Sequence, residues 1–147
     1  MKCWCGGRVG PRSPGDADGL GCLDSIYHDW AATGRRDAHT VLYVAGPMSG
    51  YEDNNYPAFH EASERLRAAG YEVVSPAEFG AEEGSSVHYV DLIREDLRAM
   101  LDCHAVAVLE NWWQSTGARN EVQVAGVLLM PVRTVSEWLE RAATELA

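Results

Sequence analysis

From Thr40 onward, short apolar runs alternate with longer segments whose apolar residues recur every three or four positions. Short apolar runs are typical of buried strands, and the longer period indicates helices that bury one face. The predicted strands and helices alternate along the chain as strands 41–46, 71–76, 104–110 and 131–135, and helices 57–69, 88–102, 115–129 and 137–146. Such alternation predicts an α/β, flavodoxin/Rossmann-like parallel sheet of four to five strands with helices on both faces.

Residues that start or stop helices support these bounds. Pro57 lies in the first turn of one predicted helix, Gly70 ends it, and Ser136 is the predicted N-cap of the last helix. Residues 80–86 (GAEEGSS) read as a loop. In a parallel sheet of this kind, ligands bind beyond the C-terminal ends of the strands.

Charge narrows the range of binding partners. The chain has a net charge of −10, and residues 1–40 contain five basic and five acidic residues, so residues 41–147 carry all of the excess. An acidic surface repels a nucleic-acid backbone, which argues against DNA or RNA as a partner. A small phosphorylated ligand is still compatible with this charge if backbone N–H groups bind it locally.

Membrane and secretion signals are not apparent in the sequence. No apolar run approaches the roughly 20 residues that a spanning helix needs, and the first residues lack the apolar centre of a signal peptide. Hydrophobic residues make up 46% of the chain and charged residues 23%, as in ordinary globular proteins. We therefore expect a cytoplasmic protein without a membrane partner.

Residues 1–40 differ from the rest and predict a loop-rich appendage, with residues 41–147 as the α/β domain. The appendage is rich in Gly, Asp, Arg and Cys and shows no clear period. It contains four soft metal ligands, Cys3, Cys5, Cys22 and His28, which suggest a small structural zinc site. The C-x-C spacing is less typical of zinc than C-x-x-C, so unligated thiols or a disulfide are the alternatives. Cys103, in the α/β domain, is expected to be a buried thiol.

Two carboxylates stand beside apolar helix faces. Glu121 borders the predicted buried face of helix 115–129, and Asp96 shares a helical face with Ile93 and Met100. A border carboxylate usually reaches solvent, because burial of an unpaired charge is costly. Two such residues, on the helices that flank one strand, instead suggest paired carboxylates of the kind that cleave glycosidic bonds.

Glycine-containing turns follow the first and third predicted strands. The turn Gly46-Pro47-Met48-Ser49-Gly50 has neither the spacing of a dinucleotide fingerprint nor that of a P-loop, so by itself it indicates only a turn. Ser115 and Gly117 begin a helix, where a cap is the default interpretation. The same geometry also presents free N–H groups to an anion.

In combination, these segments resemble the nucleoside 2-deoxyribosyltransferase-like superfamily, which also includes the 2′-deoxynucleoside 5′-monophosphate N-hydrolases. The likeness is greatest to a phage and bacterial branch that opens with Y-x-A-G-P-M-S-G. The matching stretches occur in the family's order within residues 41–135 and are Leu42–Gly50, Asn55–Phe59, Ala69–Pro76, Arg94–Leu97 and Ser115–Glu121.

The resemblance implies roles for individual residues. Glu121 matches the nucleophile that attacks C1′ of the sugar, Asp96 matches an acid that assists base protonation or positions the sugar, and Tyr43 matches a tyrosine that orients the nucleophile or sugar. The residues implied in substrate binding are Gly46, Pro47, Met48, Ser49, Gly50, Asn55, Trp112, Ser115 and Gly117. Of these, the 46–50 turn, Ser115 and Gly117 would hold the 5′ end, while Trp112 or Trp113 would stack on the base or merely pack.

The implied activity is cleavage of an N-glycosidic bond through a covalent glycosyl-enzyme, with water or a second base as acceptor. No cofactor is implied for catalysis, and family members assemble as homo-oligomers. His104 departs from the family, whose members often carry an acidic residue there. The choices between nucleoside and nucleotide, and between hydrolysis and transfer, stay open. The alternative functions are a non-catalytic nucleotide-binding or sensing module, and an interaction protein that acts through the cysteine-containing appendage.

Overall fold

The chain divides into two units, Met1–Asp37 and Ala38–Ala147. The computed structural model describes residues 40–79 and 88–146, which belong to the second unit. The predicted loop over 80–86 and the predicted zinc ligands Cys3, Cys5, Cys22 and His28 lie outside the described residues.

The core of the domain is a four-stranded sheet in the order β2-β1-β3-β4. The strands are β1 (Val41–Ala45), β2 (Glu72–Val74), β3 (Ala105–Val108) and β4 (Val132–Thr134). All three pairings are parallel, and Tyr43 at the centre of β1 lies opposite Val74 on one side and Val106 on the other. The predicted parallel α/β fold is confirmed, with four strands in the sheet.

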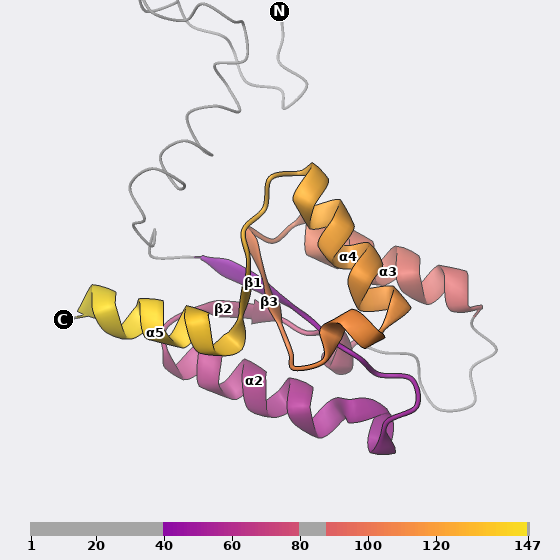
Figure 1. The fold of residues 1–147 in the computed structure, drawn as a ribbon, viewed down its shortest axis with the longest axis horizontal. Coiled ribbons are helices and arrows are strands. Elements are labelled where there is room, and N and C mark those ends of the chain that lie inside the picture. The colour runs from indigo at the N-terminus through magenta and orange to yellow at the C-terminus, as the bar shows by residue number, and fades with distance from the viewer. Residues whose placement is uncertain (1–39, 80–87, 147) are drawn as a thin grey trace, which may run out of the picture. The chain divides into compact units, whose positions relative to one another are not determined.

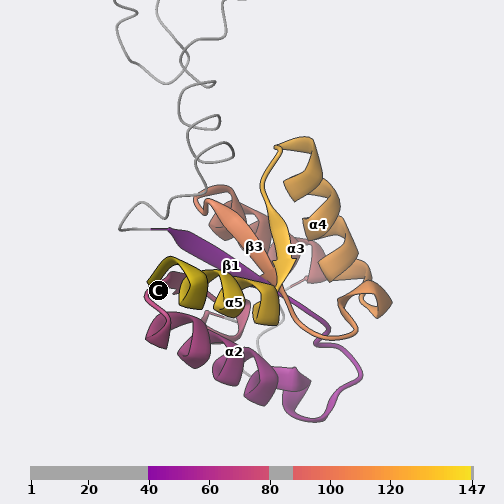
Figure 2. The same cartoon turned by 60° about the vertical axis from the view of Figure 1, so that its left-hand side comes forward.

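Two helices cover each face of this sheet, as Figures 1 and 2 show from two directions. One face is covered by α2 (Tyr56–Ala68) and α5 (Val135–Leu146), and the other by α3 (Tyr89–Leu101) and α4 (Thr116–Val127). The predicted bounds of these helices lie within two residues of the observed ones at every end. Three short 3₁₀ turns were not predicted: η1 (Glu52–Asn55), η2 (Pro76–Glu78) and η3 (Trp112–Gln114). None of the described helices is both long and apolar enough to cross a membrane.

The α2/α5 side is closed by large apolar side chains. Phe59, Leu66 and Trp138 are almost completely buried. The Trp138 Nε1 atom donates a hydrogen bond of 3.0 Å to the Val106 carbonyl, and the Tyr71 hydroxyl donates one of 3.1 Å to the Trp138 carbonyl. The Tyr71 and Trp138 rings also pack edge to face, with centroids 5.7 Å apart. This network fixes α5 on the sheet.

The start of α5 corrects the prediction of Ser136 as its N-cap. The Thr134 Oγ1 atom accepts a hydrogen bond from the Glu137 N–H, and the Glu137 Oε2 atom accepts one of 2.7 Å from the Thr134 N–H. This reciprocal pair is a capping box, in which Thr134 is the cap and Glu137 the third helical residue. Because Ser136 lies inside the helix, its side chain cannot cap it.

The loops after β1 and β3 lie at the edge of the sheet formed by the C-terminal ends of the strands, and they lead to helices on different faces of the sheet. After β1 the chain passes through α2 to β2, and after β2 it crosses back through α3 to β3 on the other side of β1. The loops after β1 and β3 therefore leave adjacent strands in different directions. In such sheets, ligands usually bind where two loops diverge in this way. A Cβ atom at Gly46 would lie only 2.7 Å from the Leu109 side chain, so glycine is required where these strand ends approach.

Candidate active site

A tyrosine from the sheet and a glutamate from α4 form a hydrogen bond inside the domain. The Tyr43 hydroxyl donates to the Glu121 Oε1 atom over 2.7 Å. Tyr43 is fully buried, and only 5% of Glu121 is exposed. Glu121 therefore does not extend to solvent, as a border glutamate ordinarily would.

The residues around Glu121 explain how α4 can hold a carboxyl against the sheet. Ala118 and Ala125 lie one turn before and one turn after it, and both are almost completely buried. Their small side chains let the helix lie close to β1 and β3, which α4 contacts. A glutamate between two alanines on this face consequently reaches Tyr43 rather than water.

Asp96 of α3 contributes the second carboxyl. It is partly buried, and burial raises its pKa to about 6, with a smaller contribution from the negative charge of Glu95. The charge of Asp96 raises the pKa values of both Glu121 and Tyr43. The three predicted catalytic residues thus form one electrostatically coupled group, contributed by β1, α3 and α4.

Burial is the main cause of the shifted pKa of Glu121, which is raised to about 8. The hydrogen bond from Tyr43 lowers this pKa and the charge of Asp96 raises it. The pKa of Tyr43 is far above its usual range because of burial and the adjacent acids, so Tyr43 stays a proton donor in its hydrogen bond. Between about pH 6 and pH 8, the two carboxyl groups together hold one proton.

Cys103 lies in the same apolar cluster as Tyr43 but is not suited to nucleophilic chemistry. It is buried, its Sγ atom donates to the Ala99 carbonyl over 3.2 Å, and burial raises its pKa to about 12. A thiol with this pKa carries almost no thiolate near neutral pH. The prediction of a buried structural cysteine is confirmed.

The loop after β1 is held in a defined turn. The Tyr51 N–H donates to the Met48 carbonyl over 3.2 Å, and Gly50 has a φ of +87°, a value that favours glycine. The Asn55 Nδ2 atom donates to the Pro47 carbonyl over 2.8 Å. Asn55, predicted to bind substrate, thus ties this loop to the start of α2. Pro47 is buried, whereas Ser49 and Gly50 are exposed.

The loop after β3 leads directly into α4. The Ser115 Oγ atom accepts a hydrogen bond of 3.2 Å from the Ala118 N–H, so Ser115 is the N-cap. Its hydroxyl hydrogen can still be donated to a ligand. A Cβ atom at Gly117 would lie 3.7 Å from the Ile93 side chain, which places α3 beside the first turn of α4.

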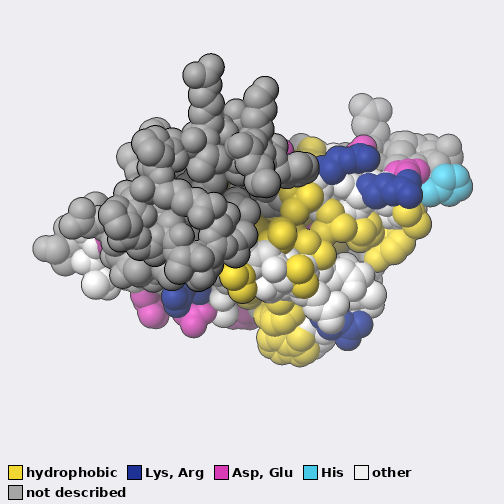
Figure 3. All heavy atoms as spheres, turned by 90° about the horizontal axis from the view of Figure 1, so that it is seen from above, with side chains coloured by type: hydrophobic (Ala, Val, Ile, Leu, Met, Phe, Trp, Pro, Cys, Tyr) yellow, Lys and Arg dark blue, Asp and Glu magenta, His cyan; other side chains and the backbone are white. Residues whose placement is uncertain are grey.

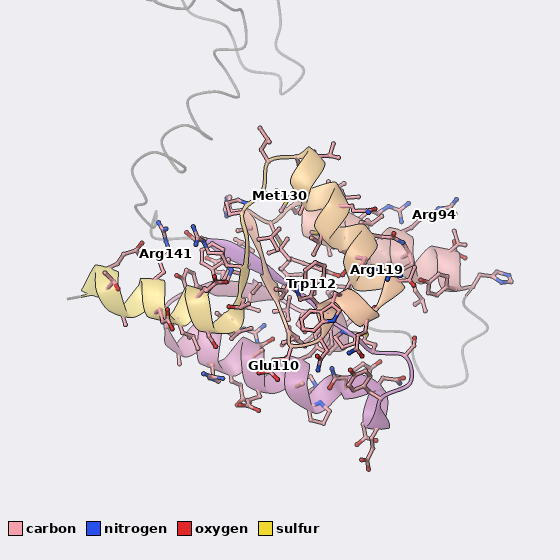
Figure 4. The ribbon with its side chains drawn as sticks, in the orientation of Figure 1. Arg94, Glu110, Trp112, Arg119, Met130 and Arg141 are labelled. Atoms are coloured by element: carbon pink, nitrogen blue, oxygen red, sulfur yellow. The ribbon has the colours of Figure 1, made fainter. Side chains whose placement is uncertain are left out.

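Sequence reasoning did not single out Arg119, which lies at this same end of α4. Its guanidinium donates to the Thr116 Oγ1 atom over 3.1 Å and to the Trp113 carbonyl over 3.4 Å. Figure 4 shows Arg119 and Trp112 near the N-terminal turn of α4, at the opposite end of the helix from Met130. The sequence signal that could have identified Arg119 is its position four residues after the N-cap Ser115, because an arginine there adds positive charge to a helix N-terminus.

The two tryptophans after β3 differ in their surroundings. Trp112 is partly buried and packs against the apolar cluster that includes Tyr43 and Val108. Trp113 is 54% exposed and lies edge to face with Trp112, at a centroid distance of 6.4 Å. Packing therefore accounts for part of the Trp112 surface, and Trp113 presents the more accessible ring.

Within residues 40–79 and 88–146, no group of three or more His, Cys, Asp or Glu side chains is arranged to hold a metal ion. His104 has a structural contact, because its Nδ1 atom accepts a hydrogen bond of 3.0 Å from the Val41 N–H. This contact lies at the N-terminal edge of the sheet, away from the predicted substrate-binding loops.

Comparison with known proteins assigns the chain to a family without assigning an activity. Residues 40–134 match the model of a domain of unknown function, DUF4406, and the chain belongs to that family. The match includes Tyr43, Asp96 and Glu121 and ends before α5. No curated protein and no solved structure matches the chain.

Proposed function

We propose that this domain is an N-glycosidase or nucleoside deoxyribosyltransferase that acts on nucleosides or their 5′-monophosphates. The observation that carries the proposal is the buried Tyr43–Glu121 hydrogen bond with the carboxyl of Asp96 acting on both groups. A carboxyl buried in this way destabilises the fold when it ionises. Such an arrangement is typical of carboxyl pairs that cleave glycosidic bonds.

In the proposed first step, the Glu121 carboxylate attacks C1′ of the sugar as the bond between C1′ and the base nitrogen breaks. The electron pair of that bond leaves with the base, which takes a proton from Asp96. The reacting form, with Glu121 ionised and the proton on Asp96, is the less populated arrangement of the single proton that the pair holds, because the pKa of Glu121 is the higher of the two. The product is a glycosyl ester of Glu121. Because Tyr43 donates to Oε1, the Oε2 atom is the one available for attack.

In the second step, water or another base gives a proton to the Asp96 carboxylate and attacks C1′ as the bond to Glu121 breaks, which releases the Glu121 carboxylate and returns the proton to Asp96. Water gives hydrolysis, and a base gives transfer. Both carboxylates would stabilise the positive charge that develops on the sugar in each transition state. Tyr43 is proposed to act as a positioning residue, because its hydrogen bond fixes the rotamer of Glu121 and favours the ionised form.

The remaining predicted residues would hold the substrate. The loop 46–50 and the N-terminal turn of α4 follow adjacent strands at one edge of the sheet. Backbone N–H groups at the start of α4, with Ser115 and Arg119, are suited to an oxygen-rich or anionic 5′ end. Trp113, with its exposed ring, is the better candidate for stacking on the base.

The proposal includes no catalytic cofactor, and any zinc held by the predicted appendage ligands would be structural. It places the protein in nucleotide metabolism in the cytoplasm. As the resemblance implies, the active protein would be a homo-oligomer.

The test is chromatography of free base released from a panel of nucleosides and 5′-monophosphates, with and without an added acceptor base. The matched variants are Glu121→Gln, which keeps the shape of the side chain, and Glu140→Gln, the same change at an exposed position of α5. We expect base release by the wild type and by Glu140→Gln, and its loss in Glu121→Gln. New nucleoside that appears only with acceptor would identify a transferase.

Two outcomes would contradict the proposal. Base release that persists in Glu121→Gln would exclude Glu121 as the nucleophile. Nucleotide binding without turnover on any member of the panel would instead favour a non-catalytic sensing module.

A further inference from the structure

The exposed aromatic side chains of residues 40–79 and 88–146 lie at one edge of the sheet. Four aromatic side chains are between 38% and 59% exposed, and they belong to the loops after β1, β2 and β3 and to the first turn of α3: Tyr51, Phe79, Trp113 and Tyr89. These segments lie at the edge formed by the C-terminal ends of the strands, which we call the C-terminal edge. The aromatic rings that solvent reaches are therefore next to the loops proposed to bind substrate.

Exposed aliphatic side chains have a different distribution. Val90 lies at the C-terminal edge, but the others lie at the opposite ends of α3 and α4: Leu101, Val127, Leu128 and Leu129. Figure 3 shows hydrophobic side chains gathered over this side of the domain. An aliphatic side chain gains from leaving water whatever it contacts, whereas the face of an aromatic ring also attracts a positive charge. The C-terminal edge thus has a kind of apolar surface that the opposite edge lacks.

Trp113 lies close to the buried carboxyl of Glu121. Trp112 packs against the apolar cluster that contains Tyr43, the hydrogen-bond partner of Glu121. The Trp113 ring lies edge to face with Trp112, at a centroid distance of 6.4 Å. The exposed face of Trp113 is therefore one ring removed from the Tyr43–Glu121 pair.

Tyr89 is placed relative to the second carboxyl by the geometry of α3. It precedes Asp96 by seven residues, which is about two helical turns or roughly 10 Å, so both lie on the same face of the helix. Ile93 lies between them on that face and is beside Gly117, in the first turn of α4. The Tyr89 ring consequently lies between Asp96 and the C-terminal edge, on the face of α3 turned toward α4.

The exposed charges among these rings are mostly negative. Three exposed acids lie in the loops after β1 and β3: Glu52, Asp53 and Glu110. The cation at the start of α4 is Arg119, whose guanidinium already donates two hydrogen bonds within the chain. The ion pair between Asp91 and Arg94 in α3 adds no net charge. Negative charge among aromatic rings is a combination that attracts and binds organic cations.

The carboxyl pair has no cationic partner among the described residues. Glu121 accepts a hydrogen bond from the neutral Tyr43 hydroxyl. The other influences on the pKa values of Glu121 and Asp96 are burial and neighbouring acids, and all of them favour the protonated forms. A positive charge bound beside the pair would favour the ionised forms instead. The site therefore lacks a cation that a substrate could supply.

The charge of the base also decides whether bond cleavage requires a proton. A neutral base leaves as an anion unless Asp96 protonates it, which requires the less populated arrangement of the shared proton. A base with a positive charge on its ring leaves as a neutral molecule, so Glu121 and Asp96 can both be ionised when it reacts. Pyridinium rings and purines alkylated at a second ring nitrogen are bases of this kind.

We propose that this site acts on nucleosides or nucleotides whose base carries a positive charge, and that the aromatic rings and acids of the C-terminal edge bind that base. This substrate class rests on the proposed function, because the same carboxyl pair cleaves the bond. The Glu121 carboxylate attacks C1′ as the bond to the base nitrogen breaks, and the electron pair of that bond neutralises the ring. Water then attacks C1′, releases Glu121 and gives a proton to the Asp96 carboxylate, which passes it to solvent.

The first experiment measures binding without turnover, by NMR titration of the full chain. The probes are 1-methylnicotinamide, a pyridinium cation, and nicotinamide, the same ring without the charge. Neither probe has a sugar, so no glycosidic bond can break. The variants are Trp113→Ala and Glu110→Gln, both at exposed positions, and the matched control is Leu129→Ala at the opposite edge.

We expect the wild type and Leu129→Ala to bind 1-methylnicotinamide about tenfold more tightly than nicotinamide, or better. Trp113→Ala should weaken binding of the cation by about tenfold, and Glu110→Gln by about threefold. Equal affinities for the two probes would overturn the proposal. An affinity for the cation that neither variant reduces would also overturn it, because the C-terminal edge would then not bind the base.

The second experiment tests the proton and distinguishes the two kinds of charged base. The substrates are nicotinamide mononucleotide and 7-methylguanosine 5′-monophosphate, with guanosine 5′-monophosphate as the neutral counterpart. Base release in the first turnover is corrected for release in buffer alone. We expect Asp96→Asn to slow release of a charged base by less than about tenfold and release of guanine by about a hundredfold or more.

The outcomes separate this proposal from the proposed function. Turnover of the neutral nucleotide with no preference for either charged one would overturn the charged substrate and leave the N-glycosidase intact. Equal slowing of all substrates by Asp96→Asn would overturn the proton-free step. No base release from any nucleotide, with the cationic probe still bound more tightly than the neutral one, would contradict the enzymatic function while supporting the charge preference of the site.

Discussion

The α2/α5 side of the sheet is closed by fully buried apolar side chains, whereas the α3/α4 side contains a buried carboxyl and leaves apolar surface exposed. On the first side, Trp138 both packs and donates a hydrogen bond to β3. On the second side, the group at the centre is Glu121, whose pKa is raised to about 8 by burial. One sheet thus has a side optimised for stability and a side that carries unfavourable groups.

The difference indicates how the domain tolerates its candidate active site. A buried carboxyl and a leucine in the left-handed conformation, Leu129 after α4, each reduce the stability of the fold. A domain whose net stability is only about 5–15 kcal/mol can accommodate such costs if the other side packs well. We therefore expect loss of the buried Trp138 ring to destabilise the domain, and loss of the ionisable group of Glu121 to stabilise it.

The largest expected effect is a loss of stability from Trp138→Ala. The change removes a fully buried ring and its hydrogen bond to the Val106 carbonyl, so we expect a loss of about 3–5 kcal/mol in the free energy of unfolding. Urea unfolding measures it. Leu101→Ala, on the other side and half-exposed, should cost less than about 1 kcal/mol in the monomer. Equal losses would refute the contrast between the two sides.

The next largest expected effect is a gain in stability, from Glu121→Gln at alkaline pH. In the folded protein the pKa of Glu121 is about 8, against an ordinary value of 4.5. Between these pH values the unfolded chain binds fewer protons than the folded one, so stability falls as pH rises. Glu121→Gln removes this loss, so its stability relative to the wild type should be about 4 kcal/mol greater at pH 9 than at pH 5.

Thermal or urea unfolding of Glu121→Gln across this pH range measures the effect. Glu140→Gln, exposed on α5, should leave the pH dependence of the wild type unchanged. A stability gain in Glu121→Gln that is the same at pH 5 and pH 9 would show that Glu121 has an ordinary pKa.

Tyr43→Phe should affect activity through Glu121. With a neutral base as the leaving group, wild-type kcat/KM should be bell-shaped in pH, with limbs near 6 and 8, because the proposed reaction then needs one proton on the carboxyl pair. Loss of the Tyr43 hydrogen bond, which lowers the pKa of Glu121, should move the alkaline limb to higher pH. The maximum should fall about 10- to 100-fold. An unchanged pH profile would show that Tyr43 does not act through Glu121.

The smallest expected effect is a loss of stability from Thr134→Ala, at the start of α5. Thr134→Ala should reduce the free energy of unfolding by about 1 kcal/mol, because Thr134 is the N-cap that exchanges hydrogen bonds with Glu137. Ser136→Ala, at the position that the sequence suggested as the cap, should have almost no effect. The reverse order of these two losses would restore Ser136 as the cap.

Much of this architecture follows from the sequence because strand and helix periods are local signals. The runs that became β1 and β3 are apolar throughout, and both strands are buried almost completely. The position of Glu121 at the border of the apolar face of helix 115–129 was enough to suggest an inward carboxyl. Its partner Tyr43 came from the resemblance, since residues 78 positions apart are joined only by the packing of α4 on the sheet.

Other features depend on contacts that a linear pattern does not contain. The apolar stripe of α3 suggests a buried helix, yet Val90 and Leu101 lie more than half exposed. Predicting the Thr134–Glu137 capping box requires knowing to within one residue where β4 ends and α5 begins. The packing of Trp112 and the engagement of Asn55 with Pro47 likewise depend on how the two loops fold.

The covalent role of Glu121 is tested most directly by intact-protein mass spectrometry of the enzyme after rapid acid quench during turnover of the best substrate. We expect a mass increase equal to one glycosyl group in the wild type and no increase in Glu121→Gln. Turnover that proceeds with no adduct on Glu121 and survives in Glu121→Gln would contradict a covalent role for the buried glutamate.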